Sequence, residues 1–436
     1  MKKTTDSKSS KTTGILLPFI LITACFALWG FANDITNPMV KAFSKIFRMS
    51  VSDGTLVQVA FYGGYFAMAI PAAMFIRRYT YKSGVMLGLG LYATGALLFL
   101  PAKATGLYYP FLLAYFILTC GLSFLETSCN PYIMAIGPKS TAIRRLNMAQ
   151  AFNPIGSLAG MFVAMNFIQN RLSPLDTAER ATLTDDAFEA VKEYDLGVLI
   201  EPYLWIGAVI LVLLILIRLT RMPNAGDDIK PVAIKDTLHR LLASAVYREG
   251  VMAQFFYVGA QIMCWTFIIQ YGTRVFMAEG MAEQEAEVLS QQYNIVAMVI
   301  FCCSRFICTW LMKYVNPARL LAIFAIYAAV MTIGVIFLDG RAGMYCLVGV
   351  SAGMSLMFPT IYGLALGPLD TDDAKIGASG LIMAILGGSV LPAIQAAIID
   401  TGDVMGIPGI NASFVMPLIC FVVVLAYAAR CLRKQV

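Results

Sequence analysis

The sequence contains few charged residues. Of its 436 residues, 13% are charged and 59% are hydrophobic, whereas a soluble globular chain carries about 25% charged residues. Hydrophobic runs of about 20 residues recur along the chain, which is the length of a membrane-spanning helix. The composition therefore excludes a soluble globular protein and predicts an integral membrane protein. The first run, Gly14 to Phe31, lacks a small-residue cleavage site and is expected to be retained as a helix.

Histidine and metal-binding cysteine patterns are also lacking. His239 is the only histidine, and it lies in a polar connection. The ten cysteines are scattered through hydrophobic runs, and the closest group, Cys302, Cys303 and Cys308, has neither CxxC spacing nor a nearby histidine. We interpret the cysteines as small packing residues. No metal site, redox role or cofactor other than a coupling proton is expected.

Twelve hydrophobic spans predict an all-α membrane protein of two pseudo-symmetric six-helix bundles. They centre roughly on residues 25, 65, 91, 121, 157, 210, 262, 300, 326, 355, 386 and 420. Short motifs repeat between the halves: Gly121-x-Ser123, Pro131 and Gly137-Pro138 recur as Gly353-x-Ser355, Pro359 and Gly367-Pro368. Such a parallel repeat is typical of a two-lobed transporter. The expected organisation is a tail over residues 1–13, bundles over 14–220 and 250–432, and a linker over 221–249.

Positive charge alternates between successive connections. Lysine and arginine gather in one set, which includes the N-terminal tail, the central linker and the C-terminus. The other set has few basic residues and includes the acid-rich stretch 171–201. The positive-inside rule then places the tail, the linker and the C-terminus in the cytoplasm. The net charge of +6 reflects this topology, and no nucleic-acid partner is expected.

Glu126 is the most informative single residue. It lies in a hydrophobic stretch from Tyr115 to Pro138, with no charged neighbour for about ten residues on either side. An ion at membrane depth costs several kcal/mol unless it is solvated, paired or protonated. Burial disfavours the charged form of a carboxyl group, so Glu126 is suited to taking up and releasing a proton. Because the only histidine lies outside the spans, a carboxyl group is the candidate proton carrier.

Other polar side chains recur at helical spacing within four predicted spans. With Glu126 they form the candidate site: Asn33, Asp34 and Asn37 in the first span, Asn130 in the fourth, Asn147, Gln150 and Asn153 in the fifth, and Tyr257, Gln261 and Trp265 in the seventh. Three structural alternatives stay open. The amides could link helices by hydrogen bonds, the aromatic rings could lie at the membrane interface, and Asp34 could simply be hydrated.

These residue types favour a neutral sugar as the ligand. Amides and carboxylates bind hydroxyl groups, and an aromatic ring covers the apolar face of a pyranose. An anionic ligand would require basic residues within the spans. The clearest one, Arg305, is interpreted as a structural ion-pair partner near the cytoplasmic end of its helix.

Other functions fit the residues less well. A membrane-embedded enzyme would need a nucleophile, a metal cluster or an acid–base pair, and Glu126 has no histidine partner in the spans. A two-lobed repeat disfavours a channel. A sugar uniporter or a sodium-coupled carrier remains an alternative to proton symport.

Several segments resemble one transporter family over nearly the whole chain. Three sets of residues carry the resemblance: Leu125-Glu126-Thr127 with Asn130-Pro131, then Arg145-LNMAQAFN-Pro154, and then Tyr257-VGAQ-Ile262. They are similar to segments of the L-fucose:proton symporter (fucose permease) family, which lies in the fucose/galactose/glucose branch of the major facilitator superfamily. The resemblance implies twelve helices, alternating access and uptake of a neutral monosaccharide with a proton. The expected location is the bacterial inner membrane, and the expected functional unit is a monomer.

The resemblance further implies two proton-coupling carboxylates. The one on the fourth helix matches Glu126, whereas the one on the first helix falls at Asn37, which is not an acid. Asp34, one turn earlier, is the second candidate for proton coupling.

Overall fold

The computed structural model describes residues 6–36, 39–49, 56–175, 179–180, 182–223, 234–403 and 406–434. The secondary-structure elements of this part of the chain are helices. Twelve segments are long and hydrophobic enough to cross a membrane: Ile15–Thr36, Val59–Arg78, Tyr81–Thr105, Tyr109–Ala135, Lys139–Ile168, Asp185–Leu219, Ala245–Ala278, Glu285–Leu311, Pro317–Phe337, Gly340–Leu366, Thr371–Asp400 and Gly409–Arg433. The predicted all-α fold with twelve spans is confirmed. A helix suits a lipid environment because it satisfies its backbone hydrogen bonds internally.

The chain divides into two compact units. Unit 1 comprises Met1–Ile136 with Phe152–Ile229, and unit 2 comprises Gly137–Ala151 with Lys230–Val436. The fifth span is therefore shared. Its first helix, α8 (Ala142–Gln150), belongs to unit 2, and its second helix, α9 (Asn153–Val163), belongs to unit 1.

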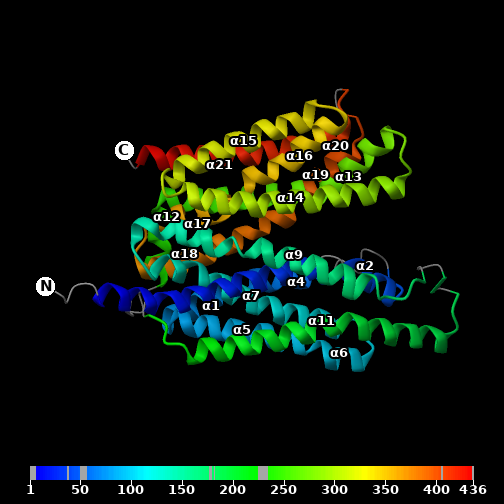
Figure 1. Ribbon diagram of the computed structural model, residues 1–436, viewed down its shortest axis with the longest axis horizontal. Coiled ribbons are helices and arrows are strands. Elements are labelled where there is room, and N and C mark those ends of the chain that lie inside the picture. Colours follow the sequence, from blue (N-terminus) through cyan, green and yellow to red (C-terminus); the bar gives the residue numbers. More distant parts are fainter. Residues whose placement is uncertain are drawn as a thin grey trace. The chain divides into compact units, whose positions relative to one another are not determined.

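In unit 1, α7 (Tyr109–Ala135) is enclosed by other helices. It packs against α4 (Leu56–Arg78), α5 (Tyr81–Leu97) and α1 (Asp6–Thr36), which run beside it in Figure 1. Every residue of α7 from Leu118 to Ile133 is buried. The remaining helices of this unit are α2 (Met39–Ile46), α6 (Phe99–Thr105), the π-helix Ala164–Gln169 and α11 (Asp185–Leu219).

A small-residue contact explains the tight packing of α7 against α5. A Cβ atom placed on Gly121 would lie 2.4 Å from the Tyr92 amide nitrogen and 2.5 Å from the Gly88 carbonyl oxygen. Only a glycine permits this approach of the two backbones. Close packing through small residues is a common way for helices to associate in membranes.

In unit 2, α13 (Ala245–Ala278) is the central helix. It packs against most of the other helices of the unit, which are labelled in Figure 1. Besides α8, the α-helices of this unit are α12 (Ile234–Ala243), α14 (Glu283–Leu311), α15 (Pro317–Phe337), α16 (Gly340–Met354), α17 (Met357–Leu366), α18 (Thr371–Met383), α19 (Gly387–Asp400), α20 (Gly409–Ala412) and α21 (Val415–Lys434).

The fifth and tenth spans are each interrupted close to a proline. The fifth span breaks between α8 and α9, next to Pro154, and the tenth breaks between α16 and α17, before Pro359. Proline has no N–H to donate to the preceding turn. The last carbonyl groups of α8 and α16 therefore need other donors.

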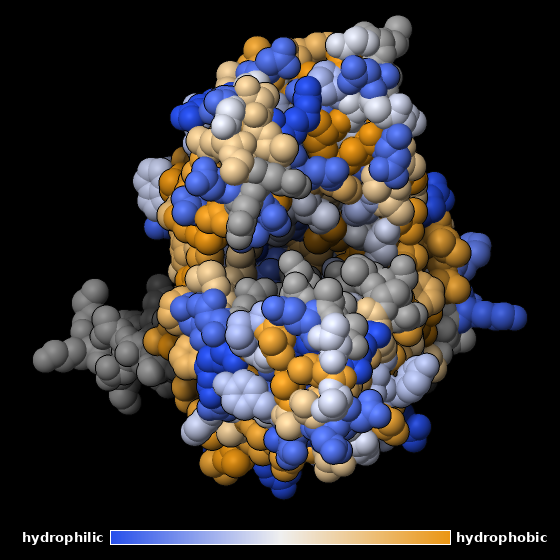
Figure 2. All heavy atoms as spheres, turned by 90° about the vertical axis from the view of Figure 1, so that its right-hand side faces the viewer, coloured by the Kyte–Doolittle hydropathy of each residue, from blue (hydrophilic) through white to orange (hydrophobic). Residues whose placement is uncertain are grey.

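The helices expose many large hydrophobic side chains. Leu219, Trp205 and Phe337 are at least 66% exposed. Figure 2 shows hydrophobic side chains on the flanks and many hydrophilic ones on the face toward the viewer, where helix ends and loops gather. Exposed hydrophobic surface of this extent fits contact with lipid.

Unit 1 also contains a fully buried ion pair outside its first five spans. Arg180 Nη2 lies 2.5 Å from Asp195 Oδ2, and both side chains are 0% exposed. The Asp195 carboxylate also accepts a hydrogen bond from the Ser173 amide at 2.8 Å. The pair therefore ties the segment before α11 to the first turns of that helix.

We predict that Asp195→Asn destabilises the protein. Removing one member of a buried ion pair costs about 3–5 kcal/mol, because the other charge stays buried without a partner. Thermal unfolding of the purified protein in detergent should show a clear drop in Tm. Glu201→Gln is the matched control, since Glu201 forms a half-exposed pair with Arg171 and such pairs contribute about 0–1 kcal/mol. Equal Tm values for the two variants would contradict this prediction.

Candidate functional site

Glu126 lies in the middle of α7 with its carboxyl group buried. The residue is 2% exposed. Asn130 donates from Nδ2 to the Glu126 backbone carbonyl at 3.0 Å, not to the carboxyl group. Among the described residues, no lysine, arginine or histidine forms an ion pair with Glu126, and its Oε2 has no hydrogen-bond partner. This is a buried acid without a counter-charge in the described part of the chain.

The predicted residues of the first span lie on α1. Asn33 and Asp34 are half-buried near its end, while Asn37 lies outside the described residues. Asn153, on α9, donates from Nδ2 to the Phe26 carbonyl of α1 at 3.2 Å. Asn153 therefore links two helices, which is one of the alternatives open at the level of sequence.

The predicted residues of the seventh span surround the end of α16. Tyr257 is fully buried and donates to the Met354 carbonyl at 3.0 Å. Trp265 donates from Nε1 to Ser351 Oγ at 3.2 Å. Its ring lies edge-on to Phe301, with 4.9 Å between centroids. Gln261, between them on α13, is half-buried.

Arg305 binds the carbonyl ends of two broken helices. It is 3% exposed, and its Nη1 donates to the Gln150 carbonyl at the end of α8, at 3.0 Å. Its Nε donates to the Ser355 carbonyl just after α16, and the guanidinium lies 4.5 Å from the centre of the Phe301 ring. The carbonyl end of a helix carries partial negative charge. The predicted ion pair of Arg305 is wrong for the described residues, because helix ends take the place of an acid.

The α8 segment is held within unit 2 by further contacts. Asn147 is fully buried and donates from Nδ2 to Thr360 Oγ1 at 3.2 Å, while its Oδ1 has no hydrogen-bond partner among the described residues. A Cβ atom placed on Gly363 would lie 2.8 Å from Ile143. Gln150, at the end of α8, is 3% exposed.

The structure thus assigns the candidate residues to two groups. Unit 1 contains Asn33, Asp34, Glu126, Asn130 and Asn153, and unit 2 contains Asn147, Gln150, Tyr257, Gln261 and Trp265. Each unit is a separate body, so the structure brings residues together only within each group.

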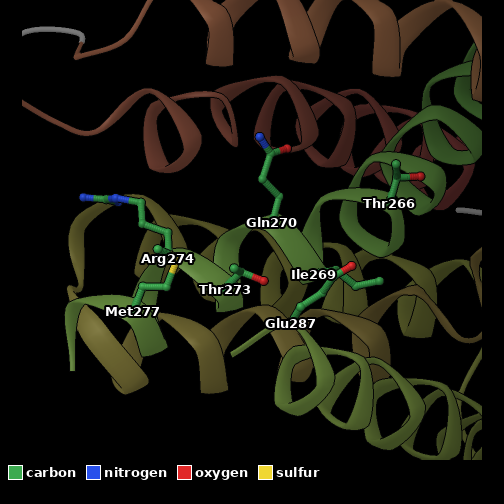
Figure 3. Close-up of a pocket in the computed structure, with 7 residues that line it drawn as sticks. All are labelled: Thr266, Ile269, Gln270, Thr273, Arg274, Met277 and Glu287. Atoms are coloured by element: carbon green, nitrogen blue, oxygen red, sulfur yellow. The ribbon is translucent and has the colours of Figure 1, made fainter. Parts of the chain in front are cut away.

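Unit 2 also contains a cavity of about 670 Å³, lined by both polar and hydrophobic side chains, which the sequence analysis does not predict. Figure 3 shows Thr266, Gln270 and Arg274 projecting from α13 at intervals of four residues, with Glu287 contributed by α14. Arg274 Nη1 donates to Asn411 Oδ1 at 2.7 Å. The four-residue spacing was available in the sequence as a signal, because it continues the polar character of the predicted seventh span.

Other residues at the site carried weaker signals. Tyr65 lies beside the Glu126 carboxyl group, yet a tyrosine in a hydrophobic run is typical of packing. Ser351 and Ser355 lie on one helix face next to the break before Pro359. The serine spacing and the proline were visible, but their partners on α13 and α14 were not.

No cluster of three or more metal-ligating side chains occurs within the described ranges. All ten cysteines are free, and eight are buried.

Comparisons with known proteins identify relatives along almost the whole chain. A family model described as Major Facilitator Superfamily matches residues 21–392. The L-fucose-proton symporter of Haemophilus influenzae is 49% identical over 95% of this chain and 96% of its own length. The Escherichia coli L-fucose-proton symporter is 32% identical over 97% of this chain and 95% of its own. A Brucella abortus glucose/galactose transporter is 30% identical over the same shares.

A solved structure of a relative agrees with these matches. The major facilitator superfamily transporter FucP, in an outward conformation, has a TM-score of 0.85 and 32% identity, with 95% of this chain and 98% of that chain covered. The more distant proton:xylose symporter XylE, at 11% identity and a TM-score of 0.71, shares the fold. This chain belongs to the L-fucose-proton symporter family of the major facilitator superfamily.

Proposed function

We propose that this protein imports a neutral monosaccharide together with a proton by alternating access. L-fucose is the first candidate substrate, because relatives at 49% and 32% identity are L-fucose-proton symporters. Galactose and glucose are the next candidates, since a relative at 30% identity is a glucose/galactose transporter. The proposed location is the bacterial inner membrane, with both termini in the cytoplasm, and the proposed functional unit is the monomer.

One observation carries the proposal: a buried carboxyl group without a counter-charge among the described residues. A carboxylate at this depth is costly, whereas a neutral carboxylic acid is tolerated. In this scheme Glu126 is protonated when sugar binds from outside and loses the proton to the cytoplasm. Asp34 is proposed as a second proton-coupling residue, because it is the acid on α1 nearest to Asn37 in sequence.

The proposed sugar ligands are the amides and aromatic rings of the predicted set. The proposal assigns the hydroxyl-binding groups to Gln150 and Gln261 and the ring face to Trp265. The other proposed sugar ligands are five asparagines and a second aromatic ring: Asn33, Asn37, Asn130, Asn147, Asn153 and Tyr257. The Nδ2 bonds of Asn147 and Asn153 to other helices leave their carbonyl oxygens as the atoms proposed to accept hydroxyl donors.

In the proposed cycle, bundles over residues 14–220 and 250–432 move about the linker 221–249, and the contacts of α8 with unit 2 belong to one state of that cycle. The neutral form of Glu126 permits the loaded protein to change conformation without carrying a buried charge. Arg305 is proposed to hold the end of α8, and with it Gln150, in the geometry that binds sugar.

We predict that Glu126→Gln abolishes concentrative uptake and preserves exchange. Glutamine imitates the protonated acid, so sugar binding and counterflow should persist while a pH gradient no longer drives accumulation. Uptake of radiolabelled L-fucose into proteoliposomes measures both. A mutant that still concentrates sugar in response to a pH gradient would contradict the proposed role of Glu126. Asp34→Asn in the same assay tests the second acid.

We also predict that Arg305→Lys lowers sugar exchange by about tenfold or more. Lysine keeps the charge but cannot span the two carbonyl groups that Arg305 binds, and a hydrogen bond to a charged group contributes about 1.5–3 kcal/mol. Arg319→Lys is the matched control, because Arg319 is an exposed residue at the start of α15. Exchange rates that are equal for the two variants would show that the Arg305 bonds do not matter for the site.

A further inference from the structure

Tyr65 of α4 lies beside Glu126 of α7 where the two helices are in close contact. Ser123 Oγ donates to the Tyr65 carbonyl at 3.1 Å, three residues before Glu126 on α7. A Cβ atom placed on Gly64 would lie 2.9 Å from the Phe116 carbonyl oxygen. These contacts fix the two backbones against each other and leave Tyr65 little freedom beyond its side-chain rotamer.

The Tyr65 side chain lies next to the Glu126 carboxyl group, but the geometry between the two groups falls short of a full hydrogen bond. Tyr65 is 4% exposed, and its hydroxyl interacts electrostatically with Glu126. Tyr65 Oη and Glu126 Oε2 are both buried, and neither has a hydrogen-bond partner among the described residues. Buried polar atoms in proteins are nearly always paired, so two such atoms side by side call for an explanation.

We propose that Tyr65 is a positioning residue for the proton carrier: its hydroxyl donates to the Glu126 carboxylate after the proton has left and separates when the proton returns. The proposal rests on the function of Glu126 proposed above. A phenol is a donor that an ionised carboxylate accepts readily, and a hydrogen bond to an ionised group is about twice as strong as one between neutral groups. The bond therefore favours the state in which the proton has been released.

The other groups near this pair are less suited to the role. Tyr92 on α5 is near Tyr65, but its hydroxyl donates to the Leu28 carbonyl at 3.0 Å. Cys129, one turn along α7, is near Glu126 and Cys25, and a thiol is a weak donor. Tyr62, on the preceding turn of α4, is near Asp34 as well as Tyr65.

The Tyr65 hydroxyl matters because no cationic side chain among the described residues of unit 1 pairs with the Glu126 carboxylate. In the described part of unit 1, no lysine or arginine pairs with Glu126. A lysine or arginine beside Glu126 would hold it permanently ionised and block proton loading. A hydroxyl stabilises the carboxylate more weakly, so the group remains able to cycle between its two states.

The test is the pH profile of L-fucose binding to the purified protein. In Tyr65→Phe the carboxylate loses its donor, so Glu126 should remain protonated to higher pH. In the wild type, sugar binding weakens at high pH as Glu126 loses its proton. In Tyr65→Phe the pH at which binding weakens should rise by about one unit, which corresponds to a tenfold change in the protonation equilibrium. Binding at the low-pH plateau should be nearly unchanged.

Tyr203→Phe is the control variant. It removes a buried hydroxyl that pairs with Tyr115 at 2.6 Å in the same unit, and its binding profile should match that of the wild type.

The outcomes separate this inference from the proposed function. A Tyr65→Phe profile that coincides with the wild type, with Glu126→Gln having lost its pH dependence, would overturn the role of Tyr65 alone. A Glu126→Gln protein that keeps the pH dependence would overturn the proton role of Glu126 and this inference with it. If Tyr65→Phe fails to bind sugar, fluorotyrosine at position 65 is the second variant. It keeps the shape and strengthens the donor, so the profile should move to lower pH, and an unmoved profile would refute the inference.

Discussion

The cost of holding a charge away from water governs the structure around Glu126. The residue lies in a helix whose residues 118–133 are all buried, and its Oε2 is shielded from solvent and has no hydrogen-bond partner among the described residues. The close contact through Gly88 and Gly121 and the contact of α4 with α7 both contribute to this enclosure. An ionised group in such a place is costly unless its surroundings provide compensation. The proposed proton coupling makes use of that cost.

Arg305, another buried ionisable group, is stabilised in a different way. Arg305 is always charged, and its partners are backbone carbonyls at the ends of α8 and α16. These carbonyls are available because the fifth and tenth spans are broken. The helix breaks and Arg305 therefore depend on each other. The breaks leave backbone carbonyl groups without intrahelical donors, and the guanidinium group donates hydrogen bonds to them. Because α8 also carries Asn147 and Gln150, the same contacts place proposed sugar ligands.

Much of the fold was predictable from the sequence, because span length and hydropathy depend on local composition. The twelve spans follow from hydrophobic runs alone, and Glu126 stands out because no charge lies near it in sequence. The partners of the polar groups were not predictable. Arg305 was expected to find an acid and instead binds helix ends, since helix breaks and their neighbours are set by tertiary packing. Tyr65 carries only a weak signal in the sequence, because the packing of α4 on α7 is what brings it to Glu126. The polar spacing of Thr266, Gln270 and Arg274 is visible in the sequence, but the cavity that they line depends on the packing of α13 against α14.

The most direct test of proton symport is to measure proton movement itself. L-fucose is added to sodium-free proteoliposomes containing the protein, and the pH of the lumen is followed without an imposed gradient. The account predicts that sugar entry acidifies the lumen in the wild type, that Glu126→Gln abolishes this acidification, and that adding sodium changes neither result. Sugar entry without acidification, or acidification that persists in Glu126→Gln, would contradict the central claim that Glu126 carries the coupled proton.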